Sequence, residues 1–379
     1  MWKVQLFKLN YDEREPKAVK EVVEGGWITM GEKTKDFESQ FASYLSGDVE
    51  CVAVSNGTAA LHMALLALGV GAGDEVIIPS LTFVADINTV KIVGATPVLA
   101  DCTSYDDWNI SPADIEAKIT PRTKAVMVVH YAGYLCDMDA ISEICRRNGL
   151  GLIEDAAHAP GARYKNRAGG TIGDIGCFSF FTNKNLSVGE GGMVASMSSE
   201  MAQSLRYFRS HGMTSLTLDR HKGRAITYDV EQPGLNYRID EMRAALGLVQ
   251  LDKLPAANAQ REQLVREYLR QLDNVKGVSV PFLFQIDNTD YTPAYHIFAI
   301  LLDAGIDRLA VIESLKEEGI QSSIHYPAFQ GFTAYKEANL AETPYAMEIS
   351  ERELTLPLYP TMTMEEVTLV CDALKKALL

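Results

Sequence analysis

The sequence predicts an α/β protein with a mostly parallel sheet that helices cover on both faces. Short apolar runs that end in polar or turn residues alternate with helical patterns, as in repeated strand–helix units. After about residue 255 the predicted helices become more charged, and two strand candidates lie among them. We expect a large α/β domain at 35–255, a smaller α+β domain at 256–379, and an N-terminal segment, 1–34, that packs across both or onto a partner chain.

Four apolar runs are the strand candidates of the large domain: 76–79, 97–101, 125–130 and 151–154. Between the last two, residues 139–148 have helical spacing, and Gly149 is placed to end that helix. Active sites in such sheets lie beyond the carboxyl ends of the strands. The residues that follow each strand are therefore the ones in which to seek chemistry.

The smaller domain is expected to alternate helices and strands. The predicted helices are 260–272 and 307–318, and the predicted strands are 295–302 and 320–324. The last helix starts at Thr363, which forms a capping-box pattern with Glu366, and runs to the C-terminus.

Composition and charge restrict the class of protein. The 379 residues are 47% hydrophobic and 22% charged, as in a globular protein, and the net charge of −15 argues against a general nucleic-acid or anionic-membrane surface. The six cysteines show no Cys-x-x-Cys pair and no zinc spacing, so we expect free thiols and no metal. Residues 1–14 lack the apolar region of a signal peptide, and the longest apolar run, 59–70, is too short to span a bilayer. These features predict a soluble cytoplasmic protein.

The first candidate site segment is Ser-Asn-Gly-Thr at 55–58, in which Gly57 and Thr58 lead into a predicted helix. The following residues, 59–68, are apolar almost all round, so this helix should be buried. Its first N–H groups and partial positive charge would make a ready phosphate site. The alternative is an ordinary N-cap, from Ser55 or Asn56, on a core helix.

The second segment follows the apolar strand at 151–154. Asp155, buried at a strand end, could pair with a protonated ring nitrogen, and His158 could reach the same ligand. The alternative is that Asp155 caps a helix and that His158 is a core residue whose hydrogen bonds are made within the protein.

The third segment is 177–192, an aromatic strand, then Lys184, then a glycine-rich turn. A lysine in an apolar pocket has a lowered pKa and becomes a nucleophile toward aldehydes. The glycines allow the backbone to approach closely. The alternative is a surface lysine in a loop.

Together the three segments fit one cofactor, pyridoxal 5′-phosphate (PLP). This cofactor needs a lysine for its aldehyde, an acid for its ring nitrogen and a cradle for its phosphate. Lys184, Asp155 and the helix start at Gly57 and Thr58 supply one of each. Phe83, after a predicted strand, is available to stack on the ring.

Longer motifs run in order from about residue 20 to the C-terminus. They lie at 26–31, 55–62, 73–80, 154–158, 176–192, 234–238 and 325–327. With these motifs the chain resembles the DegT/DnrJ/StrS nucleotide-sugar aminotransferases. The resemblance implies the aspartate-aminotransferase fold, which is fold type I of the PLP-dependent transferases.

The resemblance also implies an activity and further site residues. The expected enzyme moves an amino group from an amino acid, with L-glutamate as the expected donor, to a keto-sugar, expected to be a nucleotide-linked 4-keto sugar. Ser179 would bind the cofactor phosphate, and His158 would lie near the phenolic oxygen. Asn236 would reach the PLP phosphate of a neighbouring subunit, which implies a homodimer with shared active sites. His325 and Tyr326 would approach the substrate.

Several positions bear on the family branch. One branch has histidine in place of the lysine and dehydrates sugars, so Lys184 favours transamination. Many members have a further histidine where this chain has Phe-Gln-Gly-Phe at 329–332, which weakens the transfer of substrate detail. The stretches 26–29 and 129–133 and the spacing within 211–220 are most similar to UDP-4-amino-4-deoxy-L-arabinose aminotransferases.

Three other functions are open alternatives. The run Gly-Val-Gly-Ala-Gly at 69–73 suggests a nicotinamide-dependent oxidoreductase, but it follows a helix and precedes a strand, the reverse of the dinucleotide fingerprint. A PLP-binding sensor without turnover usually carries a DNA-binding appendage, and this acidic sequence shows none. An aminotransferase for a cyclitol or another keto substrate would differ only in its substrate-binding residues.

Overall fold

The structure is a computed structural model that describes residues 2–45, 47–215, 221–223, 226–336 and 340–379. The residue spacing noted at 211–220 lies partly outside these ranges. No helix in the described part of the chain has the length and apolar character needed to cross a membrane.

A seven-stranded sheet forms the centre of the molecule, in the order β1-β9-β8-β5-β4-β2-β3. Its strands are β1 Glu50–Val54, β2 Glu75–Pro79, β3 Thr96–Ala100, β4 Thr123–Val129, β5 Gly151–Asp155, β8 Ile175–Ser179 and β9 Gly192–Ser196. Only β9 runs antiparallel to its neighbours in this sheet. The prediction of a mostly parallel sheet is confirmed.

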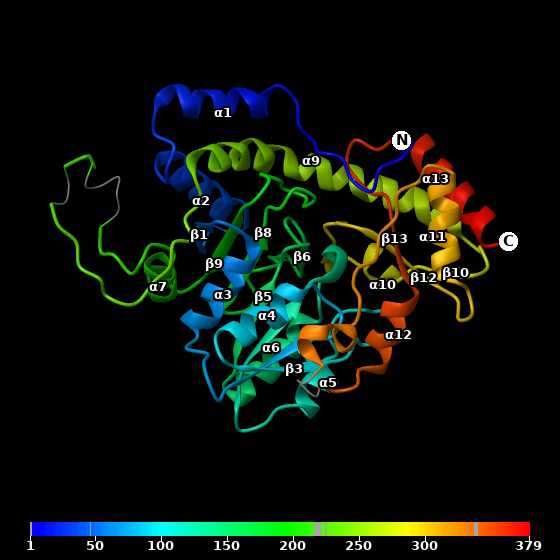
Figure 1. Cartoon of the computed structure of the whole chain (residues 1–379), viewed down its shortest axis with the longest axis horizontal. Helices are drawn as coiled ribbons and strands as arrows, with labels where there is room; N and C mark the ends of the chain where they lie inside the picture. The colour runs from blue at the N-terminus through cyan, green and yellow to red at the C-terminus, as the bar shows by residue number, and fades with distance from the viewer. Residues whose placement is uncertain (1, 46, 216–220, 224–225, 337–339) are drawn as a thin grey trace.

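Helices cover both faces of this sheet (Figure 1). They include α2 Glu32–Leu45, α3 Gly57–Ala67, α4 Val84–Ile92, α5 Pro112–Ala117, α6 Met138–Asn148 and α7 Ser199–Arg209. Successive residues of a strand point to opposite faces. Val126 and Val128 of β4 therefore pack in the apolar cluster with α2 and α6, whereas Ala125 and Met127 pack in the cluster with α3 and α4. This two-sided burial explains why the strands read as continuous apolar runs.

The C-terminal part is built around a small antiparallel sheet, β10-β12-β13. Its elements are β10 Val278–Ser279, α10 Leu283–Ile286, β12 Phe298–Leu302, α11 Arg308–Glu317, α12 Pro344–Arg352, β13 Glu353–Leu356 and α13 Met364–Ala377. A third sheet joins β6 Arg163–Tyr164, β7 Arg167–Ala168 and β11 Tyr291–Thr292. The capping box at Thr363 and Glu366 is confirmed at the start of α13.

Three predicted elements need correction. Residues 320–324 are not a strand, because Ile320 pairs only singly with Val4 and Ser323 only singly with Thr355. The strand predicted at 295–302 begins at Phe298, since Tyr295 has a left-handed φ of 49° that a strand cannot continue through. The helix predicted at 260–272 is the end of a much longer one.

That long helix, α9 Glu241–Leu272, contributes to the cores of both parts. Its first half places Ala244 and Leu254 against the central sheet, and its second half places Leu264 and Tyr268 in the C-terminal core. The predicted boundary near residue 255 falls inside this helix, and the division into domains stays a prediction.

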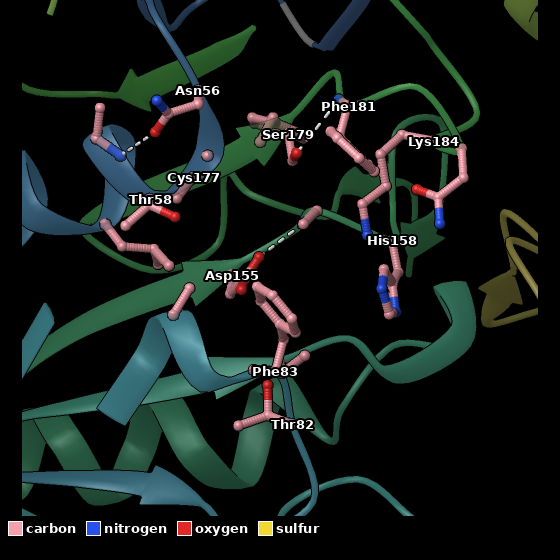
Figure 2. Close-up of a pocket in the computed structure, with 18 of the residues that line it drawn as sticks. Asn56, Thr58, Thr82, Phe83, Asp155, His158, Cys177, Ser179, Phe181 and Lys184 are labelled. Carbon is pink, nitrogen blue, oxygen red and sulfur yellow. Dashed lines mark hydrogen bonds between the residues drawn. The ribbon is translucent and has the colours of Figure 1, made fainter. Parts of the chain in front are cut away.

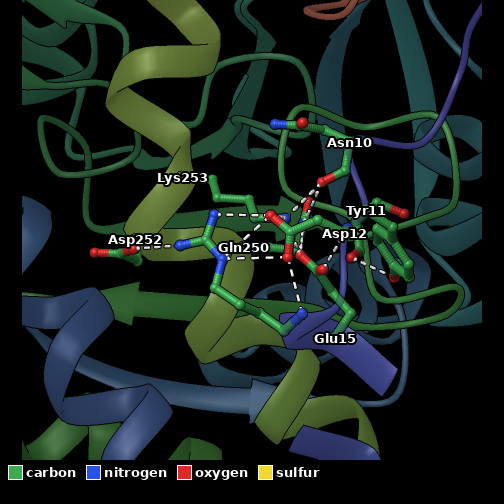
Figure 3. Close-up of polar contacts among 9 residues, drawn as sticks. Asn10, Tyr11, Asp12, Glu15, Gln250, Asp252 and Lys253 are labelled. Carbon is green, nitrogen blue, oxygen red and sulfur yellow. Dashed lines mark hydrogen bonds and ion pairs between the residues drawn. The ribbon is translucent and has the colours of Figure 1, made fainter. Parts of the chain in front are cut away.

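The N-terminal helix α1, Arg14–Gly25, lies alongside α9 (Figure 1). At its start Glu15 is fully buried and forms an ion pair with Lys253 of α9 (Figure 3). Gln250 donates a hydrogen bond of 2.7 Å to the same Glu15 oxygen, and the backbone N–H of Asp12 donates to the other, at 2.8 Å. Both oxygens of the buried Glu15 carboxylate therefore have partners, and the contacts with Gln250 and Lys253 fix α1 on the long helix.

We predict that Glu15→Ala lowers the free energy of unfolding by about 3 kcal/mol. The variant leaves the buried Lys253 ammonium without its main ion-pair partner. Urea denaturation of the two proteins measures the loss. Asp252→Asn is the matched control: Asp252 pairs with Arg14 on the same helix surface but is largely exposed, so its loss should be far smaller. Equal losses in the two variants would contradict the role given to the buried pair.

Candidate active site

A cavity of about 640 Å³ lies at the carboxyl ends of the central strands (Figure 2). It contains all of the predicted site residues except Asn236: Gly57, Thr58, Phe83, Asp155, His158, Ser179, Lys184, His325 and Tyr326. The topology explains this convergence. Residues that follow β1, β2, β5 and β8 meet at one edge because these strands run in the same direction.

The start of α3 forms one wall of the cavity. Asn56 is the N-cap, and its side chain accepts the N–H of Ala59 at 2.8 Å. Gly57 and Thr58 are the first residues of the helix, so their N–H groups have no acceptor within it. Asn56 is thus an ordinary N-cap, as the alternative interpretation of this segment expected. The N–H groups of Gly57 and Thr58 are still suited to bind an anion.

Gly57 allows this helix start to approach the end of β8 closely. A Cβ added at Gly57 would lie 2.8 Å from the Cβ of Ser179 and 3.2 Å from its hydroxyl oxygen. The close approach places the Ser179 hydroxyl beside the α3 N–H groups, so that one small region gathers several hydrogen-bond donors.

Lys184 extends into the cavity from the turn after β8, and its side chain points toward His158 in Figure 2. Burial lowers the pKa of this lysine to about 8, although negative charge on Asp155 or Asp86 acts in the opposite direction. Roughly a tenth of the amine is therefore unprotonated at pH 7, far more than for a lysine with the usual pKa.

Asp155 is the last residue of β5, and its residue surface is 7% exposed. Its Oδ1 accepts the N–H of Ala157 at 2.8 Å (Figure 2). Burial raises the pKa of this carboxyl, while the Ala157 N–H and Lys184 favour its charged form. The arrangement holds an acid at the floor of the cavity, facing a lysine.

His158 is buried beside this pair and is held in one tautomer. Its Nδ1 accepts the N–H of Ala132 at 3.2 Å, so the proton of the neutral ring is on Nε2, 3.1 Å from the hydroxyl of Tyr326. Burial, assisted by the positive charge of Lys184, lowers the pKa of His158 well below its usual value. The neutral ring is thus a hydrogen-bond donor toward Tyr326.

Phe83, Tyr326 and a second histidine, His325, form another wall of the cavity. Phe83 lines the cavity and is 54% exposed, and its ring centroid lies 5.7 Å from that of Tyr326. His325 lies 2.8 Å, through Nδ1, from the hydroxyl of Thr355, and burial lowers the pKa of His325 to about 4. This wall is therefore aromatic and uncharged.

Asn236 is exposed and lies outside the cavity. It belongs to an extended segment in which Asn236 pairs with Ser210 and Arg238 with Val54. The next residue, Tyr237, lines the cavity instead, with its hydroxyl 2.9 Å from Nδ1 of His62. Because neighbouring residues of an extended chain point to opposite sides, Asn236 faces outward, and its reach toward a partner subunit stays a prediction.

The sequence interpretation missed three polar residues. Thr82 and Tyr237 line the cavity, and Asp86 is buried beside Asp155. Thr82 and Asp86 follow β2 as Phe83 does, so the rule that site residues follow strands could have identified them. Among the described residues, no group of three or more His, Cys, Asp or Glu is placed to hold a metal ion.

Comparison with known proteins identifies the family. Residues 10–375 match the model of the DegT/DnrJ/EryC1/StrS aminotransferase family. The chain belongs to this family. It is therefore an aminotransferase, and the family resemblance read from the motifs is confirmed. The closer likeness to the arabinose aminotransferases stays a prediction.

Two known proteins resemble the chain over nearly its whole length. The spore coat polysaccharide biosynthesis protein SpsC of Bacillus subtilis (strain 168) is 40% identical over 374 residues, which cover 96% of this chain and 94% of SpsC. The aminotransferase TlmJ from Streptoalloteichus hindustanus superposes with a TM-score of 0.91 at 33% identity, covering 100% of this chain and 99% of TlmJ.

A third similar protein bears on the cofactor. Spr1654 from Streptococcus pneumoniae is described as a sugar aminotransferase, and its structure was solved in a PLP form. That structure superposes on this chain with a TM-score of 0.90 at 29% identity, and the match covers 97% of each chain. The same protein was solved in a PMP form, with a TM-score of 0.91. These structures agree with the cofactor that the sequence predicts and confirm the fold.

We predict that Gly57→Ala destabilises the PLP-free protein by about 1–3 kcal/mol, because the new methyl group overlaps the Ser179 side chain. Thermal unfolding measures the change. Ser179→Gly in the same chain should recover most of it, whereas Gly71→Ala, where a Cβ meets nothing within 4 Å, should have little effect. A double variant no more stable than Gly57→Ala would show that this contact is not the cause.

Proposed function

We propose that this aminotransferase uses PLP to transfer an amino group from L-glutamate to a nucleotide-linked keto-sugar whose carbonyl is at C4. The observation that carries the proposal is the position of Lys184 and Asp155 in one cavity with the start of α3. SpsC, in polysaccharide biosynthesis, and Spr1654, described as a sugar aminotransferase, support a sugar as the amino acceptor.

The cavity fits the cofactor group by group. When bound, PLP supplies an aldehyde for an amine and a protonated ring that withdraws electrons from the reacting carbon. The N–H groups of Gly57 and Thr58 and the hydroxyl of Ser179 would hold the phosphate. Asp155 would pair with the ring nitrogen, and the exposed face of Phe83 would stack on the ring.

Lys184 has two tasks in this proposal. Its amine holds the cofactor between reactions, which a pKa of about 8 permits near neutral pH. When an amino donor is bound in place of the lysine, the freed Nζ atom would act as the base for the proton on the donor's Cα and would return that proton as an acid. Asp155 keeps the ring nitrogen protonated while this proton moves.

The two histidines and Tyr326 would arrange the remaining groups. His158, through its Nε2–H, lies on the side proposed for the phenolic oxygen of PLP and donates to the hydroxyl of Tyr326. His325 and Tyr326 close the cavity over the substrate. Because burial lowers the pKa of both imidazole rings, they are weaker bases than the Lys184 amine.

The assembly and the location belong to the same proposal. The outward orientation of Asn236 supports a homodimer in which this residue reaches the phosphate region of the partner's site. We also propose that the enzyme works in the cytoplasm, where the six free cysteines would stay reduced.

The proposal predicts two half-reactions. L-Glutamate should bleach the visible absorbance of the purified holoenzyme and release 2-oxoglutarate, and a nucleotide-4-keto-sugar should restore the absorbance and yield an amino sugar by mass spectrometry. Lys184→Ala should lose both the characteristic absorbance and all detectable turnover. Normal turnover by this variant would refute the assignment, and recovery with a keto-cyclitol alone would replace the proposed acceptor.

A second prediction concerns pH. The rate at which the PLP-free enzyme captures PLP should rise about tenfold per pH unit below pH 8 and level off above it, because only the neutral Lys184 amine reacts. Asp155→Asn should slow the half-reactions. It should also move this midpoint to lower pH, because the Asp155 charge raises the pKa of Lys184 and the variant lacks that charge. Stopped-flow absorbance measures both effects.

Glu190→Gln provides the control for the pH prediction. Glu190 also lines the cavity, but it is exposed there, so its charge is screened by water and the midpoint should stay in place. An unchanged midpoint in Asp155→Asn would remove Asp155 from its proposed position beside the amine.

A further inference from the structure

A second buried carboxyl, that of Asp86, lies beside the proposed catalytic pair. Asp86 is in the first turn of α4 and has no exposed surface. Its Oδ2 accepts the hydroxyl of Thr82 at 2.5 Å. Its Oδ1 is also buried and meets no hydrogen-bond donor in the part of the chain that the structure describes. A buried oxygen without a partner is costly, so this one needs an explanation.

The groups that face Asp86 come from four segments. Asp155 of β5 lies within hydrogen-bonding reach, Lys184 approaches from the turn after β8, and the thiol of Cys177 and the hydroxyl of Tyr326 lie nearby. Two adjacent buried carboxyls cannot both ionise without a large cost. A single proton shared by the two carboxyls removes that cost and gives the Oδ1 atom of Asp86 a hydrogen bond.

The surroundings decide which carboxyl carries the proton. Asp155 accepts the Ala157 N–H and lines the cavity with the Lys184 amine, and both groups favour its charged form. Asp86 has only the Thr82 hydroxyl, and its complete burial raises its pKa well above the usual value. The proton therefore belongs on Asp86.

We propose that Asp86 is a positioning residue that remains a neutral acid and donates a hydrogen bond from Oδ1 to Asp155, holding Asp155 as a carboxylate aimed at the ring nitrogen of PLP. The inference rests on the role proposed above for Asp155. Its consequence extends to the lysine. An ionised Asp86 would raise the pKa of Lys184 and leave less free amine, so a neutral Asp86 keeps the amine reactive.

Two substitutions separate a hydrogen-bond donor from a second negative charge. In Asp86→Asn the amide oxygen can accept from Thr82 while the amide N–H replaces the acid's O–H toward Asp155. Asp86→Ala removes the donor. We expect Asp86→Asn to keep kcat within about threefold of the parent enzyme, and Asp86→Ala to lower kcat about tenfold or more with little change in the KM for L-glutamate.

The protonation state of Asp86 can be measured in the protein without cofactor and without substrate. The infrared spectrum of the PLP-free protein at neutral pH should contain a C=O stretch of a protonated carboxyl that Asp86→Asn removes. Glu353→Gln is the control: burial raises the pKa of Glu353 to about 8, so this variant should remove a different band. The two assignments then check each other within one protein.

Stability supplies an independent measurement. Asp86 ionises near pH 4 in the unfolded chain but keeps its proton in the folded protein, so the parent protein loses stability as pH rises above that value. Asp86→Asn has no such proton to keep. The difference in Tm between Asp86→Asn and the parent should therefore widen in favour of the variant between pH 5 and pH 7.

Specific results would overturn this inference. They are identical infrared spectra for the parent and Asp86→Asn, a Tm difference that does not change with pH, or a loss of kcat in Asp86→Asn as large as in Asp86→Ala. The spectra and the Tm values need neither PLP nor substrate, so they test Asp86 separately from the proposed function, which the Lys184→Ala variant tests. The spectra and the Tm values of the parent protein and Asp86→Asn are also enough to test the inference if Asp86→Ala does not fold.

Discussion

The electrostatic balance between the Lys184 amine and the Asp155 carboxylate governs what the cavity can do. Burial alone would make both groups neutral, and pairing alone would keep both charged. The lysine pKa of about 8 lies between these limits. The neighbours of each group preserve the balance: the Ala157 N–H favours the carboxylate, and the uncharged rings of His158 and His325 add no competing positive charge near the amine.

The parallel sheet brings these groups together, and it does so only because α3 can begin very close to β8. Strand ends from four parts of the sequence converge at one edge, where each supplies a different group. The close approach depends on the absence of a side chain at Gly57, because a Cβ there would collide with Ser179. One glycine thus connects the packing of a core helix with the place proposed for an anion.

Much of this site could be predicted from the sequence, because strands, helix starts and the residues after strands are local patterns. Lys184, Asp155 and Gly57 were identifiable in this way. The partners that act on them are not local. Asp86 becomes important only because β5 lies near the start of α4, and the inward orientation of Tyr237 rather than Asn236 depends on how the segment pairs. The same limit explains the error at 320–324, whose pairing is set by tertiary contacts with Val4 and Thr355.

The cavity also depends on how the two apolar cores are held together. His158 follows the central sheet, whereas Tyr326 packs against the C-terminal core, and the hydrogen bond between them crosses from one part to the other. A small displacement of either part would break this contact and free the Tyr326 hydroxyl. The long helix α9 enters both cores and resists such a displacement, and the buried Glu15–Lys253 pair fixes α1 against it. Packing far from the cavity therefore helps to set the distance at which a histidine and a tyrosine meet over the proposed cofactor site.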